Sequence, residues 1–384
     1  MRSRADVDVL VVGAGPAGAL AAWRLARAGL RVTILDRERF PRHKLCGDTL
    51  NPGGVALLES LRLSRSPVGT ALPLAGMLVT GPQARVEARY GGLVVGRAIE
   101  RRVLDHWLVS EAMAAGAVLE EAVAVRGPLV DDTPDGPVVG GVRVVARFDA
   151  AREYSLTARM TVAADGRGSV LARALGLSSS PRIPRRWAFG TYASGIADVR
   201  DLGEMHIRGK RYVGVAPVAN GLCNVCVVTG PRPTGGSPMG IIRATIDADS
   251  ELRERFAGAR FDAPVSVLGP LAVGSHGCGV DGLLVAGDAA GFVDPMTGDG
   301  LHLAMRGALL AADEVLVALE SGRSQDAPAR LAAARAQALS RKLRFNMMLR
   351  ELVETPLAVR AAAWTARLAP AAVRWAVRYA GDAA

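Results

Sequence analysis

The sequence of 384 residues contains no uninterrupted apolar run of the roughly 18 residues that a membrane-spanning helix needs. A strand pattern already begins at residue 7, which leaves no room for a signal peptide ahead of it. Half of the residues are apolar and 22% are charged, a composition typical of globular proteins. We therefore expect a cytoplasmic protein, and the chain is long enough for two domains.

Cysteine is also scarce, with four residues in the whole chain. Cys223 and Cys226 have the spacing of redox and zinc pairs, but they lie in an alternating apolar stretch. In a strand, an offset of three places two side chains on opposite faces of the sheet. Because no second pair of cysteines or histidines completes a zinc site, we predict buried thiols and no metal centre.

Acidic residues are outnumbered by basic ones, 37 against 47, and the formal net charge is +10. The arginines are scattered without a basic block, and aromatic residues make up only 4% of the chain. This pattern argues against a nucleic-acid partner. The charge suits anionic cofactors or an acidic lipid surface instead.

A buried strand runs into a glycine-rich turn near the start of the chain. Residues 7–12 are apolar, as in a parallel strand covered on both faces, and residues 17–28 follow with a helical pattern of small side chains. Gly13 permits a tight turn, Gly15 lets a pyrophosphate approach the backbone, and Gly18 lets the helix pack closely on the strand. The turn that we expect to hold the anion consists of Gly13, Gly15, Pro16, Ala17 and Gly18.

A second strand over residues 31–35 ends on Asp36, 18 residues after Gly18. This spacing predicts that Asp36 binds a ribose 2′-hydroxyl. It favours FAD or NAD over NADP, because an acid would repel a 2′-phosphate. Residues 37–48 then form a polar loop with five basic side chains, His43 included. Open α/β sheets bind ligands at this edge, so we expect the loop to face a cofactor.

The middle of the chain contains both helices and strands. Asn51 as an N-cap predicts a helix over residues 53–61, and another is expected over residues 100–115. Residues 77–96 are expected to form two strands about a turn at Gly91 and Gly92. Further strands are predicted over residues 138–145, 154–162 and, as a second sheet that carries the substrate, within residues 186–228.

Arg101 stands at the start of the helix over residues 100–115 and has two interpretations. It could reach a phosphate or another edge of the cofactor. It could equally form a surface ion pair with Asp105.

Two more motifs follow predicted strands. Asp165 and Gly166 form an acid–glycine turn, and Gly287 and Asp288 come directly after an apolar strand. The second of these is followed by residues 294–300, which lead into a long helix over residues 301–319. N–H groups at the start of that helix would stabilise negative charge on a bound group.

Together these motifs resemble the three FAD fingerprints of the para-hydroxybenzoate hydroxylase-like flavoproteins, over about residues 5–320. Within that superfamily, residues 44–48 and 287–300 are most similar to the geranylgeranyl reductase-related branch. That branch also contains many flavin monooxygenases of secondary metabolism.

The resemblance implies an FAD site in which the glycines of the first motif hold the pyrophosphate, Asp36 the adenosine ribose and Asp288 the ribityl chain. Arg101 and Asp165 would bind other parts of FAD, and Cys46 and Gly47 would lie near the flavin. The remaining residues that we assign to the cofactor are Arg37, Asp48, Gly166, Gly287, Pro295, Gly298, Asp299 and Gly300. We name no catalytic residue, because His302 and Asp48 are as easily structural.

The resemblance also implies an α/β architecture of two domains. A Rossmann-like FAD-binding domain would comprise residues 1–76, 97–182 and 270–325, and a β-sheet substrate domain residues 77–96 and 183–269. Residues 326–384 would form a C-terminal helical cap. Its basic helices could lie on a membrane surface or, as we favour, pack over the substrate domain with their arginines in solvent.

Departures from related patterns narrow the function. There is no second dinucleotide motif and no Trp-x-Trp pair, which argues against disulfide reductases and flavin halogenases. Isoprenoid reductases resemble one another in a Tyr-x-Trp-x-Phe-Pro segment. Here Tyr212 and Pro217 are present, and we assign both to the substrate site, but both interior aromatic residues are replaced.

We therefore expect a monooxygenase in which NADPH or NADH reduces FAD and O2 then hydroxylates or epoxidises a small apolar substrate, aromatic or polyketide-like. The alternative is an ene-reductase of the geranylgeranyl reductase type that acts on isoprenoid double bonds. A third hypothesis is a non-catalytic module that binds FAD or NAD.

Overall fold

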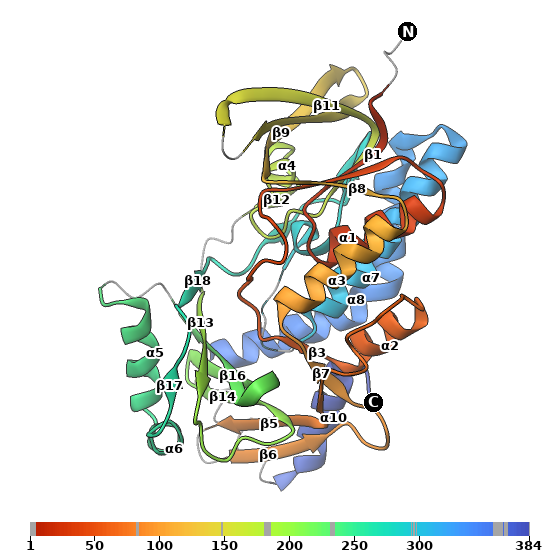
Figure 1. Cartoon of the computed structure of the whole chain (residues 1–384). Helices are drawn as coiled ribbons and strands as arrows, with labels where there is room; N and C mark the ends of the chain where they lie inside the picture. The colour runs from red at the N-terminus through yellow and green to blue at the C-terminus, as the bar shows by residue number, and fades with distance from the viewer. Residues whose placement is uncertain are drawn as a thin grey trace.

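The computed structural model describes residues 5–81, 84–146, 149–179, 186–230, 235–292, 294, 296, 298–355, 364 and 368–383. The structure contains two large β-sheets, one in the upper and one in the lower half of Figure 1. The architecture is α/β with an additional sheet domain and C-terminal helices, as predicted.

Parallel strands form the centre of the first sheet. Their order is β21 (Leu283–Val285), β11 (Asp149–Ala163), β1 (Val7–Val12), β2 (Val32–Asp36) and β8 (Val118–Glu121). At the edges, β20 (Gly279–Val280) pairs with β21, while β10 (Gly136–Ala146) pairs with β11 and with β9 (Val123–Thr133). All five central strands therefore end at one edge of the sheet.

β1 is apolar throughout because both faces of the sheet are covered. Val9 and Val11 pack toward α1 (Pro16–Arg27), α3 (Arg101–Ala114) and α7 (Gly300–Ser321). Leu10 and Val12 pack toward the β9–β10 ribbon and α4 (Val170–Ala174). A strand buried on both sides reads as a continuous hydrophobic run, as observed.

The second sheet has the order β17 (Arg260–Phe261), β13 (Trp187–Ser194), β16 (Leu222–Thr229), β15 (Arg211–Pro217), β14 (Leu202–Arg208), β5 (Gly76–Gly81) and β6 (Ala84–Arg89). β18 (Ser266–Leu268) also pairs with β13. Helices α5 (Pro238–Asp247) and α6 (Ser250–Arg255) cover one face. The other face packs against loops that follow strands of the first sheet.

Short elements connect the two sheets. β3 (Thr49–Leu50), β7 (Gly96–Ala98) and β4 (Leu72–Leu74) form a small sheet, beside which lies α2 (Pro52–Ser60). β12 (Ser178–Ser179) pairs with β19 (Gly274–Ser275). The 3-10 turns that lie wholly within the described residues are η1 (Ala219–Gly221), η2 (Gly287–Ala290) and η4 (Ser324–Asp326).

The C-terminal helices take different positions. α8 (Ala327–Glu354) packs along α7, whereas α10 (Pro370–Ala380) packs on β6 and β5 (Figure 1). Of the two C-terminal helices described here, α10 covers the second sheet and α8 does not. Within the described residues, none of the helices combines the length and the apolar composition needed to cross a membrane.

One sequence-based expectation needs correction, one strand was missed and one expectation is confirmed. The predicted turn at Gly91 and Gly92 exists, since the Val94 N–H donates to the Gly91 carbonyl at 3.2 Å, but it joins β6 to β7. The two strands predicted to pair about it are wrong, because β6 pairs with β5 up to Gly81 and Ala84. The long strand β9 was not predicted. Cys223 and Cys226 are confirmed as free thiols that belong to apolar clusters on opposite faces of the sheet.

α5 begins with an N-cap that can be tested on its own. Ser237 accepts a hydrogen bond from the backbone N–H of Gly240 at 3.0 Å. We expect Ser237→Ala to lower the free energy of unfolding by about 1 kcal/mol in urea denaturation, because this N–H loses its partner. Ser250→Ala, one residue inside the start of α6, is the control and should change stability little. Equal losses in both variants would contradict the cap assignment.

Candidate functional site

The turn after β1 has no room for side chains at two of its glycines. Gly13 has a φ of +97°, and a Cβ added to Gly18 would lie 1.8 Å from the carbonyl oxygen of Gly13. Gly15 differs: among the described residues, a Cβ there would meet the Arg42 guanidinium alone, at 3.6 Å. The start of α1 thus faces open space beside a cation, an arrangement that suits a phosphate.

Gly15 is the N-cap of α1, and Pro16 and Ala17 are its first helical residues. Within the described part of the chain, no side chain caps this helix end, and its first turn contains no acidic residue. The N-terminal N–H groups and the positive end of the helix dipole are therefore left for a ligand.

The carboxylate of Asp36, at the end of β2, is hydrogen-bonded to the glycine turn. Oδ2 accepts a hydrogen bond from the N–H of Ala14 at 2.7 Å, and Oδ1 accepts one from Glu38 at 2.9 Å. Asp36 therefore lies beside the turn, and its bond to a ribose stays a prediction. Arg37, in contrast, has an exposed side chain 3.6 Å from the Glu38 carboxylate.

The second and third motifs adjoin the first because β11 and β21 are neighbours of β1 in the sheet. A Cβ added to Gly13 would lie 2.8 Å from the Cα of Asp165. One added to Gly287 would lie 2.7 Å from the Cβ of Ala17. The structure therefore brings these predicted site residues together at the carboxyl ends of three strands.

Asp165 fixes the start of α4. Its Oδ2 accepts a hydrogen bond from the N–H of Val170 at 2.9 Å, and burial raises its pKa. Gly166 follows with a φ of +80°, a conformation that glycine adopts without strain. Among the described residues, Oδ1 of Asp165 has no hydrogen-bond partner, which leaves one buried acceptor at the motif.

Three cationic side chains, Lys44, Arg101 and Arg167, lie near Asp288 at this edge of the sheet, and Arg42 lies near Lys44. Desolvation and the charges of Arg42, Arg101 and Arg167 lower the pKa of Lys44, although its side chain is partly exposed to solvent. Burial raises the pKa of Asp288 in spite of the nearby Arg167, Arg101 and Lys44. A bound pyrophosphate would relieve the repulsion among these cations.

Arg101 belongs to a buried ion pair. Its Nε and Nη2 donate to the two oxygens of Asp105 at 2.7 and 2.8 Å, and both residues are buried. Arg42 lies 3.2 Å from the same carboxylate. The expected partner Asp105 is correct, but the pair is not on the surface. It is part of the group of cations near Asp288.

Asp48 joins the loop after β2 to the second sheet. Its carboxylate accepts hydrogen bonds from the Tyr192 hydroxyl, from the Asn224 side-chain amide at 2.8 Å and from the Arg101 N–H at 3.1 Å. Burial raises the pKa of Asp48, while these donors favour its charged form. Asn224 also donates to the Cys46 carbonyl at 2.8 Å. Three donors on one carboxylate indicate a structural role.

The segment ahead of α7 is held from two sides. Gly298 has a φ of +68°, and Gly300 is the first residue of the helix. Between them, the buried Asp299 accepts a hydrogen bond from the Asn51 side-chain amide at 2.6 Å. Lys342 of α8 lies 3.5 Å away, and burial raises the pKa of Asp299 to about 7.

Asp382, after α10, completes this cluster. Its carboxylate is 2.9 Å from the His302 Nδ1 and 2.9 Å from the Lys342 ammonium. Asp299, His302 and Asp382 offer ligand atoms within 4.8 Å of one another. Because Lys342 contacts both carboxylates, we interpret the cluster as a network of ion pairs rather than a metal site.

The two predicted substrate residues lie on opposite faces of β15. Tyr212 faces the first domain, where its hydroxyl donates to Asp294 at 2.7 Å. Arg186 lies 3.0 Å from the same carboxylate. Pro217 is an odd number of residues away, on the face that α5 and α6 cover. The structure does not bring the two together, and Tyr212 reaches the segment that precedes α7.

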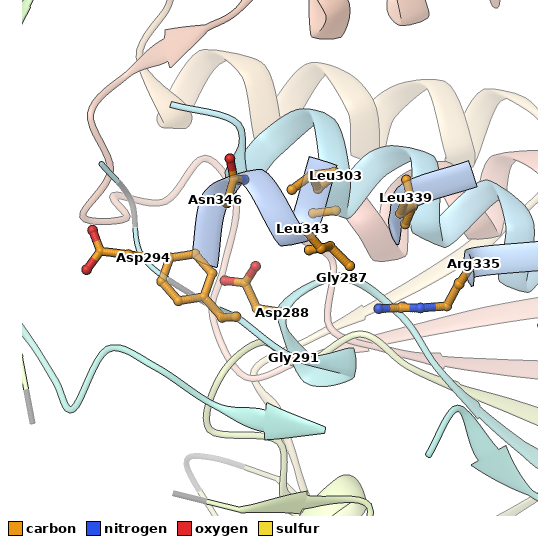
Figure 2. Close-up of a pocket in the computed structure, with 12 residues that line it drawn as sticks. Gly287, Asp288, Gly291, Asp294, Leu303, Arg335, Leu339, Leu343 and Asn346 are labelled. Carbon is orange, nitrogen blue, oxygen red and sulfur yellow. The ribbon is translucent and has the colours of Figure 1, made fainter. Parts of the chain in front are cut away.

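A cavity of about 40 Å³ lies between the third motif and α8. Figure 2 shows Asp288 and Asp294 on one side of it and Leu339, Leu343 and Asn346 of α8 on the other. α8 therefore covers the third motif, and its apolar side chains approach the residues expected to contact FAD.

Other predicted residues are less constrained by contacts. Cys46 is half-buried with a pKa raised by burial, and Gly47 is exposed. Pro295 lies outside the described residues.

Sequence reasoning missed several polar residues of the site. Tyr192, Asn224 and Lys342 belong to no sequence motif that could have indicated them. Arg42 and Lys44 belong to the basic loop that we expected to face the cofactor.

The residues at this edge fit FAD. Gly15 leaves a cradle that a Cβ would fill, cations face it, and Asp36 borders it. A family model described as an FAD binding domain matches residues 6–342.

Similar proteins include reductases and other flavin enzymes. The chain is 30% identical over 329 residues to digeranylgeranylglycerophospholipid reductase 2 of Methanopyrus kandleri, over 82% of this chain and 78% of that protein. It is 30% identical over 336 residues to menaquinone reductase of Mycolicibacterium smegmatis, over 82% and 76%.

The solved structure of a flavin-dependent brominase superimposes with a TM-score of 0.82 over 98% of this chain and 93% of that one. Its sequence identity is 19%, so this likeness shows the fold alone. The family match and the reductase relatives go further: the chain belongs to the FAD binding domain family and is an FAD-dependent oxidoreductase.

Proposed function

We propose that the protein is an FAD-dependent ene-reductase that saturates carbon–carbon double bonds of an isoprenoid lipid, with NADPH or NADH as the reductant. Relatives that cover about four-fifths of the chain are a digeranylgeranylglycerophospholipid reductase and a menaquinone reductase. Their names favour the reductase over the monooxygenase expected from the sequence.

The apolar cluster between the second sheet and the cofactor loops carries the proposal. Side chains of β14 and β16 meet side chains from the loops of the first domain in one cluster around Tyr212, and the partly buried ones are Leu45, Met205, Ile207, Cys226, Leu268, Phe292 and Met296. The carboxylate that borders this cluster, Asp294, is paired with Arg186. Transfer of a hydrocarbon chain from water to such an apolar surface would be favourable.

The residues of the site would bind and orient the cofactor. The N-terminus of α1 with Arg42 would hold the pyrophosphate, Asp36 the adenosine ribose, and the N–H groups at the start of α7 the pyrimidine edge of the flavin. When bound, reduced FAD supplies a hydride, and a proton completes the saturation of the double bond.

The monooxygenase reaction is the second candidate, because of Gly214 and Ala216. These residues share the Tyr212 face of β15 and stand where the isoprenoid reductase pattern has aromatic side chains. Their small size would leave space for a wider, ring-shaped substrate. The non-catalytic hypothesis is set aside, since the chain is an oxidoreductase.

Product mass distinguishes the two reactions. Holoenzyme reduced anaerobically by NADPH or NADH is mixed with a geranylgeranyl phospholipid or with menaquinone, and the product is analysed by mass spectrometry. The reductase predicts addition of two hydrogens per double bond without O2. Addition of an oxygen atom only when O2 is admitted would replace the proposal by the monooxygenase.

A further inference from the structure

We propose that α10 and the loop over residues 91–94 form a docking surface for an anionic phospholipid membrane. The loop joins β6 to β7 and runs beside α10. Leu93 at its tip is 99% exposed, and Val94 is also exposed. Gly91 and Gly92 both have positive φ angles, which lets the loop project its apolar side chains into solvent.

The loop and the helix make one continuous surface. Nε of Arg378 on α10 donates to the carbonyl of Arg89 at 2.9 Å, and its guanidinium lies beside Gly91. Gly381 packs against the ring of Tyr90, just before the loop. Because α10 also packs on β6, the loop cannot move far from the helix (Figure 1).

α10 adds exposed apolar side chains to the loop. Trp375 is 56% exposed, and Leu368, just ahead of the helix, is 65% exposed. Trp375 also contacts Phe345 of α8 edge-on, with ring centroids 6.5 Å apart. This contact fixes α10 against α8.

The charges that flank the apolar side chains are mainly positive. Arg374 and Arg378 of α10 and Arg341 and Arg344 of α8 are all exposed. Glu351 is an acidic neighbour on α8. Tryptophan and leucine bordered by arginine is the composition of helices that lie in the interface of anionic bilayers.

A bilayer fits this surface better than a protein partner does. A single leucine that projects almost wholly into solvent finds a complementary environment in fluid acyl chains without a preformed pocket. Membrane docking does not depend on the proposed reaction, although a lipid substrate would itself lie in the membrane.

Vesicle binding of the full-length holoenzyme tests the proposal. We expect co-sedimentation with vesicles of equal parts phosphatidylcholine and phosphatidylglycerol, weaker binding in high salt, and little binding to phosphatidylcholine alone. Leu93→Ser should lower the partition coefficient by roughly tenfold or more, because the leucine would no longer be buried in acyl chains. This variant removes no contact within the protein, so it should fold normally.

Matched control variants on α3 distinguish binding through this surface from non-specific vesicle binding. Met113→Ser, at an exposed position of α3, should bind vesicles like the parent protein. Arg374→Gln should weaken binding to the anionic vesicles by about fivefold, whereas Arg102→Gln on α3 should not. Failure to bind either vesicle, or equal losses in Leu93→Ser and Met113→Ser, would overturn the proposal.

Docking of a protein partner would give a different result, a change in oligomeric state. If light scattering shows a dimer that Leu93→Ser converts to a monomer, and neither form binds vesicles, the surface joins two copies of the chain and the membrane proposal fails. Neither result bears on the mass-spectrometric test of the reaction, so the two proposals fail separately.

Discussion

A Gly15→Ala variant is expected to fold like the parent protein and to bind FAD roughly ten- to a hundredfold more weakly. Gly15 has a φ of −71°, which alanine adopts freely, and its Cβ would meet the Arg42 guanidinium at 3.6 Å. The methyl group would instead occupy the space into which the pyrophosphate must fit. Lost hydrogen bonds from N–H groups to a charged ligand account for about 1.5–3 kcal/mol.

Gly18→Ala, unlike Gly15→Ala, should destabilise the fold of the FAD-free protein. Its Cβ would lie 1.8 Å from the carbonyl oxygen of Gly13, so α1 and the turn must separate. We expect the FAD-free protein to lose about 3 kcal/mol or more of its free energy of unfolding. Urea denaturation without FAD and fluorescence titration with FAD measure the two effects. Unchanged FAD affinity in Gly15→Ala would contradict the assignment of the pyrophosphate to this turn.

Local patterns predicted the first motif because its parts lie close together in the sequence. A strand buried on both faces, a turn limited to glycine by steric contacts and an acid on the next strand each leave a local signature. Asp36 could be placed beside the turn because β1 and β2 are neighbours in the sheet, paired in parallel.

The hairpin of β5 and β6 shows where local signals mislead. Gly91 and Gly92 are the conspicuous turn residues, but the strands pair up to Gly81 and Ala84. Register follows the alternation of buried side chains along both strands rather than the nearest glycine pair. The two glycines belong to the exposed loop beside α10 instead.

Residues that meet across long distances in the sequence could not be predicted. Asp299 is surrounded by side chains from the N-cap of α2, from α8 and from the residues after α10, and each of these stretches is ordinary by itself. The same holds for Asp48, whose donors Tyr192 and Asn224 belong to no sequence motif. Their burial depends on tertiary packing, which periodicity does not report.

Between about pH 4 and pH 7, we expect the FAD-free protein to become less stable as the pH rises, because of Asp299. Its pKa is raised by burial from 3.8 to about 7 in the folded protein. In this window the folded chain keeps the proton that the unfolded chain has lost, so stability falls with rising pH. The contribution is up to about 4 kcal/mol, from about 1.4 kcal/mol for each pKa unit.

Asp382 acts in the opposite direction and in a different window. Its pKa is lowered against the effect of burial by hydrogen bonds from His302 and Lys342. It therefore contributes stability above its unfolded pKa that is lost as the pH falls through its folded pKa. That loss takes place below about pH 4, so it does not mask the effect of Asp299.

Urea denaturation across the pH range measures the slope, and two variants assign it. Asp299→Asn cannot ionise and should reduce the loss of stability toward pH 7 by the contribution of Asp299, whereas Asp313→Asn, at an exposed ion pair, should keep the parental slope. The buried Asp48, Asp165 and Asp288, whose pKa values are also raised, account for the slope that remains. Asp382→Asn removes a negative charge that raises the pKa of Asp299, so the loss should end at a lower pH and be smaller in total. If Asp299→Asn keeps the parental slope, Lys342 holds Asp299 ionised throughout, and the cluster works as a permanent salt bridge between α7 and α8.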